Sequence, residues 1–153
     1  MRVSIRDTPL MEITLRRYEK PQGMEDRELV RKLCLSLGLL QPGDSRDIIV
    51  DILLVLLQLR KEKTEISSDE INRLVIELRK ERGLSLVGTA KSNIRRQLKR
   101  LRAMHLVEKR KAKYRINEFN RLSEIYTEKI QQFMLANIEV RVKEYLVEID
   151  RRF

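Results

Sequence analysis

The first part of the chain shows two patterns of apolar and polar positions in succession. Apolar and polar residues alternate within residues 3–15, which predicts extended structure. Apolar residues then recur at helical spacing, and the pattern predicts a helix from Asp26 that ends at Gly38. Residues 1–43 are therefore expected to form an N-terminal extension made of a strand-like segment and an amphipathic helix.

The longest apolar segment follows a connector of turn-forming residues at 41–45. Asp44 or Ser45 is expected to cap a helix that runs to about Lys61, because either side chain can accept bonds from free amides. The sequence IIVDILLVLLQL is apolar on nearly every side, so we interpret it as a core helix covered by neighbours. A membrane span needs about twenty apolar residues, and this run is interrupted by Asp51. We expect no membrane partner.

A capping-box pattern predicts the start of the next helix. Ser67 can accept a bond from the amide three residues on, and Glu70 can reach back toward it. This helix is expected to end at Gly83, and Glu65–Ile66 before it could form a short extended piece.

The following helix is expected to span Ala90–Met104, with Thr89 as its candidate cap. Because successive helical residues are rotated by about 100°, apolar and basic positions separate onto opposite sides. The predicted core side consists of Ala90, Ile94, Leu98, Leu101 and His105. A short basic β-hairpin is predicted over residues 106–116, with Glu108 placed to pair with Arg115 across its strands.

Residues 119–153 contain neither Gly nor Pro and are expected to form one long helix. Its apolar positions have an average spacing near the 3.6 residues of a straight α-helix. This stripe consists of Leu122, Tyr126, Ile130, Phe133, Ile138, Val142, Tyr145 and Ile149. Because such a helix extends beyond a small domain, the stripe is expected to be the dimerisation surface of a homodimer.

The excess positive charge is concentrated in one segment of the chain. The protein has 33 Lys and Arg, 23 Asp and Glu, and a net charge of +10. Residues 91–115 contain eleven of the basic residues and one of the acidic residues, which leaves 22 of each elsewhere. A charge focus of this kind indicates a polyanionic partner. The high content of charged residues also gives the composition a thermophile-like character.

Residues that could support catalysis are few. The chain has one histidine, one cysteine and five dispersed glycines, so it lacks a multi-cysteine metal site and a glycine-rich phosphate loop. Cys34 falls on an apolar stripe, where a buried unreactive thiol is expected. We therefore expect a protein that is not an enzyme and needs no cofactor or metal. A single cysteine fits the reducing cytoplasm.

Three segments together resemble the winged helix-turn-helix transcription regulators. They are SSDEINRLVIEL for the first helix of the motif, TAKSNIRRQLKRLRAMHLVEK for the recognition helix that runs into the wing, and RKAKYRIN for the wing. The resemblance implies a mainly α fold, with a winged helix-turn-helix domain at 44–118, a small β-hairpin wing and a long C-terminal helix. The helices around the motif resemble the dimer architecture of the MarR regulators, whereas no metal-sensing cysteine pair of the ArsR type is present.

In that family the recognition helix enters the major groove and the wing follows the backbone or the minor groove. Near the front of the basic helix, side chains that can read base edges are expected to be Ser92, Asn93, Arg95 and Arg96. Phosphate contacts are expected from Thr89, Lys91, Lys99, Arg100, Lys109, Arg110, Lys111 and Lys113.

The sequence therefore favours a sequence-specific double-stranded DNA-binding transcriptional regulator that acts as a homodimer. Two alternatives remain open: a winged-helix adaptor that binds protein or RNA, and a non-specific DNA-binding protein of chromatin or replication. The residues identify no small-molecule effector. The connector between Gly83 and Thr89 is longer than the turn of a simple helix-turn-helix.

Overall fold

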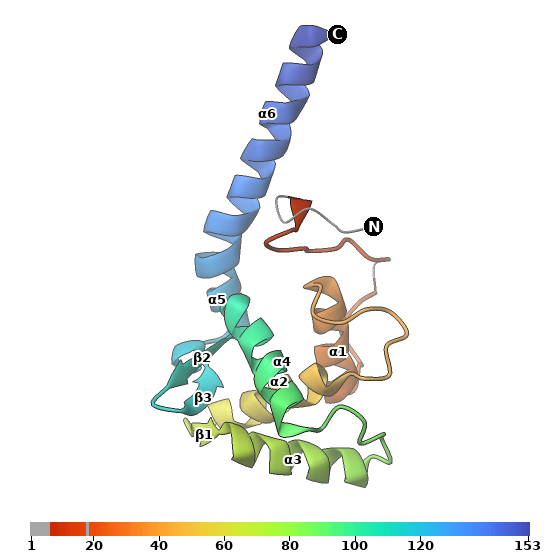
Figure 1. Ribbon diagram of the computed structural model, residues 1–153, viewed down its shortest axis with the longest axis vertical. Helices are drawn as coiled ribbons and strands as arrows, with labels where there is room; N and C mark the ends of the chain where they lie inside the picture. The colour runs from red at the N-terminus through yellow and green to blue at the C-terminus, as the bar shows by residue number, and fades with distance from the viewer. Residues whose placement is uncertain (1–6, 18) are drawn as a thin grey trace.

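The computed structural model describes residues 7–17 and 19–153, and the chain is mainly helical with a small three-stranded antiparallel sheet (Figure 1). In chain order the elements are α1 (Asp26–Ser36), α2 (Ile48–Arg60), β1 (Ile66–Ser67), α3 (Ser68–Glu81), α4 (Lys91–Ala103), β2 (Val107–Arg110), β3 (Lys113–Ile116), the 3-10 turn η2 (Asn117–Phe119), α5 (Leu122–Ile125), the π-helical η3 (Tyr126–Leu135) and α6 (Ala136–Arg152).

Helix α2 lies at the centre of the hydrophobic core. Its residues 48–56 are all buried, and α1, α3, α4 and β3 pack around it. A helix that is apolar on all sides needs neighbours on all sides. The burial of α2 and its four neighbours therefore confirm the prediction of a core helix. No helix in the described part of the chain combines the length and apolar character needed to cross a membrane.

Helix α1 shares this core, since Val30 and Cys34 are buried against it. The helix ends as predicted: Gly38 has a φ of +72°, and the amide of Leu39 donates to the carbonyl of Cys34 at 2.9 Å. The predicted strand is wrong where it can be judged. Residues 3–6 lie outside the described part, and residues 7–15 form no strand but run past the end of α1.

The sheet has the order β1-β3-β2, so the last strand lies between the other two. Strands β2 and β3 form the predicted hairpin, in which Glu108 lies opposite Arg115. Strand β1 pairs with the other side of β3, with Ile66 opposite Tyr114. The short extended piece predicted before α3 is therefore confirmed as an edge strand.

The predicted helix caps have different outcomes. Ser67 caps α3 as predicted, since its hydroxyl accepts from the amide three residues on at 3.3 Å. Neither Asp44 nor Ser45 caps α2: the Asp44 carboxylate instead accepts from the amide of Arg46 at 2.9 Å within the turn. The residue before α2 is Asp47, and its side chain makes no cap bond because it binds arginines inside the protein.

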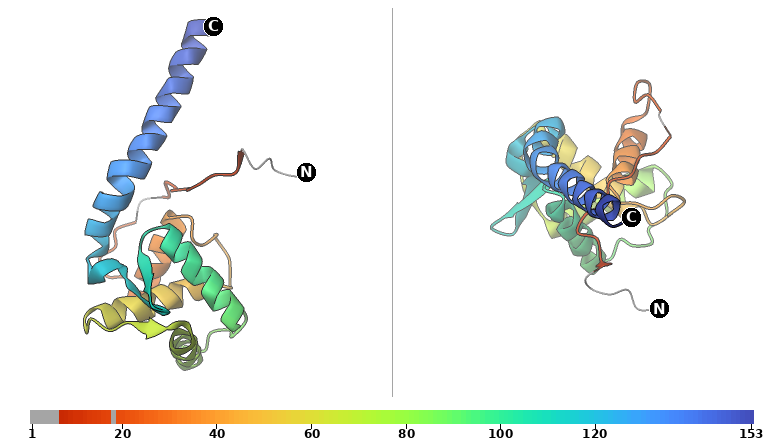
Figure 2. Two further views of the ribbon diagram at one scale, coloured as in Figure 1. Left: turned by 60° about the vertical axis from the view of Figure 1, so that its left-hand side comes forward. Right: turned by 90° about the horizontal axis from the view of Figure 1, so that it is seen from above.

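The C-terminal residues form one continuous helical rod that projects from the rest of the molecule, as Figure 1 and the left view of Figure 2 show. The long helix is as predicted, but η3 has π-helical winding. Bonds from residue i to i+5 place residues about five apart on one side. Accordingly Ile125 and Ile130 are buried and Leu135 is half-buried, whereas Phe133 is 61% exposed.

The predicted dimerisation stripe is therefore divided along the rod. Leu122 and Tyr126 are half-buried and Ile130 is fully buried, all against the core of their own chain. Beyond them Phe133, Ile138, Val142, Tyr145 and Ile149 are exposed. Ile130 is covered by its own subunit, so the exposed apolar positions begin after it.

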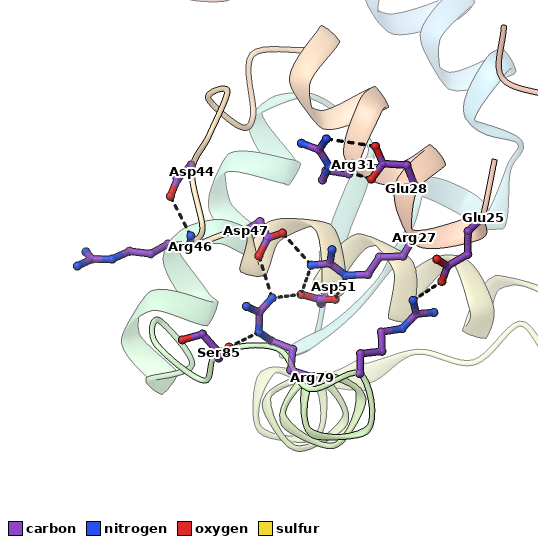
Figure 3. A network of polar contacts seen from close by, with 11 residues as sticks. Glu25, Arg27, Glu28, Arg31, Asp44, Arg46, Asp47, Asp51, Arg79 and Ser85 are labelled. Atoms are coloured by element: carbon purple, nitrogen blue, oxygen red, sulfur yellow. Dashed lines mark hydrogen bonds and ion pairs between the residues drawn. The ribbon is translucent and has the colours of Figure 1, made fainter. Parts of the chain in front are cut away.

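A buried network of ion pairs joins α1, α2 and α3 (Figure 3). Asp51 is completely buried and accepts from Arg27 at 2.9 Å and from Arg79 at 2.5 Å. Asp47 accepts from the same two arginines, at 2.9 and 3.0 Å. Arg79 also donates from Nε to the backbone carbonyl of Ser85 at 2.6 Å. The network therefore connects three helices to the segment that leads into α4.

The environment of these groups favours their charged forms. Burial opposes the charge of Arg27, but its bonds to Asp51 and Asp47 outweigh that effect and raise its pKa. Burial also opposes the charge of Asp47, and its bonds from Arg27 and Arg79 outweigh burial and lower the pKa of the carboxyl group. A buried charge in such a site is tolerated only while its partners remain.

Removing the central carboxylate should therefore destabilise the protein strongly. We expect Asp51→Asn, which keeps the side-chain size, to lower the free energy of unfolding by about 3–5 kcal/mol because Arg27 and Arg79 lose a buried counter-charge. Urea denaturation followed by circular dichroism measures this. Glu77→Gln, which breaks the exposed pair with Arg73, is the control and should cost less than about 1 kcal/mol. Equal losses in the two variants would contradict a structural role for the network.

Candidate nucleic-acid interface

Helix α4 is anchored by one side and open on the other. Ile94, Leu98 and Leu101 are completely buried, which confirms the predicted apolar side of the helix. Two other predicted core positions are wrong, since Ala90 and His105 are exposed. The helix ends at Ala103, and His105 then adopts a φ of +62° in a tight turn; Met104 is buried in its place.

The open side of α4 carries most of the polar positions predicted to contact DNA. The exposed polar residues of α4 are Lys91, Ser92, Arg95, Arg96, Lys99, Arg100 and Arg102. Lys91 makes one ion pair, with exposed Asp69 at 3.4 Å. Among the residues that the structure describes, the other five basic residues of α4 have no acidic partner. The side facing solvent is therefore strongly positive.

Charged residues on other exposed helices are arranged differently. On α3 Arg73 pairs with Glu77 at 3.2 Å, and on α6 Lys143 pairs with Glu139 at 3.1 Å. Such pairs four residues apart neutralise each other on a helix surface. The like charges on α4 instead repel by a few tenths of a kcal/mol for each pair, which sets this helix apart from the other exposed helices.

Asn93 lies where α4 meets the preceding connector, and it is half-buried. Its side-chain amide donates to the carbonyl of Gly88 at 2.7 Å. Its side-chain oxygen accepts from Arg96 at 2.8 Å and from Gln97 at 3.1 Å. Asn93 thus fixes the start of the helix and the orientation of Arg96, a role that the sequence pattern did not reveal.

Thr89 does not cap α4, contrary to the prediction. Its hydroxyl donates to the carbonyl of Leu86 at 2.7 Å, and the helix begins at Lys91 without a side-chain cap. The backbone carbonyl of Thr89 instead accepts from Asn72 of α3 at 2.6 Å. The connector is therefore tied to α3 at both ends, since Arg79 of the same helix holds the carbonyl of Ser85.

Gly88 allows the connector to pass close to α2. Its φ is +90°, and a Cβ atom there would lie 3.2 Å from Cγ1 of Ile48. A side chain at this position would strain the backbone and crowd the core helix. The same close approach places the carbonyl of Gly88 within reach of Asn93.

The hairpin beside α4 extends the positive surface. Lys109, Arg110, Lys111 and Lys113 are all exposed. Glu108 and Arg115 form the predicted ion pair across the strands, and the Arg115 guanidinium lies 4.7 Å from the centre of the Phe119 ring. The one acidic residue of the segment is thus engaged at the base of the hairpin. The tip of the hairpin remains cationic.

Other reactive groups do not gather into a site. Cys34 is completely buried, and burial raises the pKa of its thiol to about 12. His105 is exposed at the end of α4. Within residues 7–17 and 19–153, no three His, Cys, Asp or Glu side chains are grouped as metal ligands.

Comparisons with known proteins do not connect this chain to a family. No protein-family model matches it, and neither the curated proteins nor the solved structures compared with it include a match.

The turn of the hairpin stores backbone strain that a substitution should release. Lys111 and Ala112 have φ values of +47° and +64°, a left-handed conformation that suits Gly and costs other residues about 1 kcal/mol. We expect Ala112→Gly to raise the free energy of unfolding by about 0.5–1 kcal/mol. Ala103→Gly, at the end of α4, is the matched control and should lower it. Chemical denaturation of both variants is the measurement, and destabilisation by Ala112→Gly would contradict the strained turn.

Proposed function

We propose that this protein is a double-stranded DNA-binding transcriptional regulator of the winged helix-turn-helix type, which acts as a homodimer. The observation that carries the proposal is the basic side of α4, which is free of acidic residues and lies beside a basic hairpin on a firmly packed helix. Positive side chains fixed on such a surface bind phosphates and release condensed counterions.

The order of elements supports this type of fold. Helices α2, α3 and α4 are followed by the hairpin β2–β3, and β1 lies between α2 and α3 and completes the sheet. In the proposed assignment α3 is the first helix of the motif, α4 is the recognition helix and the hairpin is the wing. The extended connector before α4 is compatible with this assignment because α3 and the buried network hold it.

Base readout is proposed for the exposed front of α4. Arg95 and Arg96 can each donate two bonds to guanine in the major groove, and Ser92 can contact either type of base. Asn93 uses one amide hydrogen for Gly88 and its oxygen for Arg96 and Gln97. We therefore assign Asn93 the role of positioning Arg96, so that base contact by Asn93 itself becomes the less favoured interpretation.

Phosphate contacts are proposed for the surrounding basic groups, which fix the position of the protein on the duplex. They are Lys91, Lys99, Arg100, Lys109, Arg110, Lys111 and Lys113. Thr89 is a weaker candidate because its hydroxyl donates to Leu86. The logarithm of the binding constant falls linearly with the logarithm of the salt concentration, and each neutralised phosphate adds about 0.9 to the steepness of this slope.

The exposed apolar residues of α6 support the proposal of a homodimer. No residue of α6 is buried, although Val142, Tyr145 and Ile149 are apolar and more than half exposed. With Ile138 they form a short seam whose spacing of four, three and four residues puts Val142 and Ile149 at equivalent positions of a heptad repeat. Apolar residues repeated at this spacing form the seam along which two helices can pair. A parallel pair would bring both copies of α4 to the same end of the dimer.

A comparison of two variants tests the proposed division between readout and phosphate binding. We expect Arg96→Ala to weaken binding to the preferred sequence by about 1–3 kcal/mol and to relax specificity at one base pair. Lys111→Ala should weaken all duplexes alike and reduce the salt slope by about 0.9. The preferred sequence comes from selection out of a random duplex pool, and fluorescence anisotropy gives the affinities.

The same experiment separates the proposed function from its alternatives. Equal losses on specific and random DNA in both variants would remove the readout assignment. A selection that enriches no sequence would indicate a non-specific DNA-binding protein. Tighter binding of RNA than of duplex DNA across the salt range would favour an RNA-binding adaptor.

A charge placed in the α6 seam should separate the subunits. We expect Val142→Asp to shift the protein from dimer to monomer at micromolar concentration, because a carboxylate would be buried between the two helices. Val147→Asp is the matched control, since Val147 is 67% exposed and lies on the opposite side of the helix from the seam. Sedimentation velocity measures the mass, and a monomeric wild type would contradict the homodimer.

A further inference from the structure

A small pocket lies between the connector before α2 and the side of α4. Its volume is about 300 Å³, and three arginines line it: Arg46 from the connector, and Arg96 and Arg100 from α4. Asp44 and Asn93 also contribute to its walls. The pocket is therefore lined by three arginines and one acidic residue, contributed by two segments about fifty residues apart in the chain.

The arginines are available to a bound anion. Arg100 is held in place by a bond to Gln97 at 2.8 Å and by a longer one to the carbonyl of Gly38 at 3.4 Å. Both are neutral acceptors, so the positive charge of Arg100 is not cancelled. Arg46 is exposed, and Figure 3 shows its side chain pointing away from the buried network. Within the described residues neither Arg46 nor Arg100 forms an ion pair.

The two acidic residues nearest to Arg46 in the chain, Asp44 and Asp47, have other hydrogen-bond partners. Asp47, the residue after Arg46, turns inward and binds Arg27 and Arg79. The carboxylate of Asp44 accepts the backbone amide of Arg46. Asp47 is therefore not among the residues that line the pocket, and the lining residues carry three positive charges and one negative charge, an excess of two positive charges.

We propose that this pocket binds one phosphate group, held by Arg46 and Arg100. Guanidinium groups donate paired hydrogen bonds to phosphate oxygens, and two of them from different segments can hold a tetrahedral anion between them. The volume is at the lower end of the range for ligand pockets, which suits a single phosphate better than a large ligand.

A phosphate of the DNA backbone is the source that fits the position of the pocket, and this assignment rests on the proposed function. The pocket shares Arg96 with the face proposed to read bases, so a duplex lying on α4 would pass over it. Arg46 would then be an additional DNA contact from outside the helix and the hairpin. A free phosphate or a phosphorylated small molecule has the same chemistry.

The salt dependence of binding to duplex DNA tests the backbone source. We expect Arg46→Gln to reduce the slope by about 0.9, so that the advantage of the wild type falls about 3.5-fold between 50 and 200 mM salt. Arg100→Gln should have the same effect, and the double variant should lose only one phosphate if both residues bind the same group. Arg121→Gln is the control, because Arg121 is exposed beside α1 and α2, outside this pocket.

The alternative source, a free phosphate, is tested by titrating the DNA-free protein with inorganic phosphate and monitoring the titration by nuclear magnetic resonance. A slope reduced by about 0.9 in Arg46→Gln, with only weak binding of inorganic phosphate, supports the DNA backbone. Saturable phosphate binding that Arg46→Gln abolishes, with the DNA slope unchanged, supports a free anion as the ligand.

An unchanged slope together with no phosphate binding in the pocket overturns the inference. A wild type that binds no DNA refutes the proposed function alone, since the phosphate titration still decides whether the pocket takes an anion. Both variants should keep the thermal midpoint of the wild type, because Arg46 and Arg100 are exposed.

Discussion

The arrangement of this protein depends on the need to neutralise charge inside its core. Asp51 lies in the middle of the most apolar helix and is completely buried, so two arginines must reach it from α1 and α3. Arg79 completes its own hydrogen bonding at the carbonyl of Ser85. The network thereby ties α1, α3 and the connector before α4 to the core helix α2.

The same network influences the surface. Asp47 and Asp51 neutralise arginines in the interior, whereas the basic residues of α4 face solvent without acidic partners in the described chain. The protein therefore keeps its acidic residues away from one face while pairing charges on α3 and α6. Repulsion among the residues of α4 is small for each pair, and the firm packing of Ile94, Leu98 and Leu101 easily supports it.

The molecule also separates its two proposed binding surfaces. The basic face belongs to α4 and the hairpin, which are built onto the core, while α6 extends away with exposed apolar residues (Figure 1). The π-helical segment η3 joins the two parts. It buries Ile130 against the core and turns Phe133 outward, so the exposed seam of α6 starts beyond the point where the rod leaves the domain. Pairing through α6 would leave the basic face open.

The sequence alone determined the features that depend on near neighbours: the buried helix α2, the Ser67 cap, the apolar side of α4 and the pairing of Glu108 with Arg115. The helical repeat of 3.6 residues predicts the buried sides, and short local motifs predict the cap and the hairpin pair. Tertiary structure alone decided the burial of Arg79, the engagement of Asn93 and Thr89 by the connector, and the placement of Arg46 and Arg100 on one pocket. Asp51 and Arg79 are 28 residues apart, and no local pattern encodes which distant charges the packing of helices will bring together.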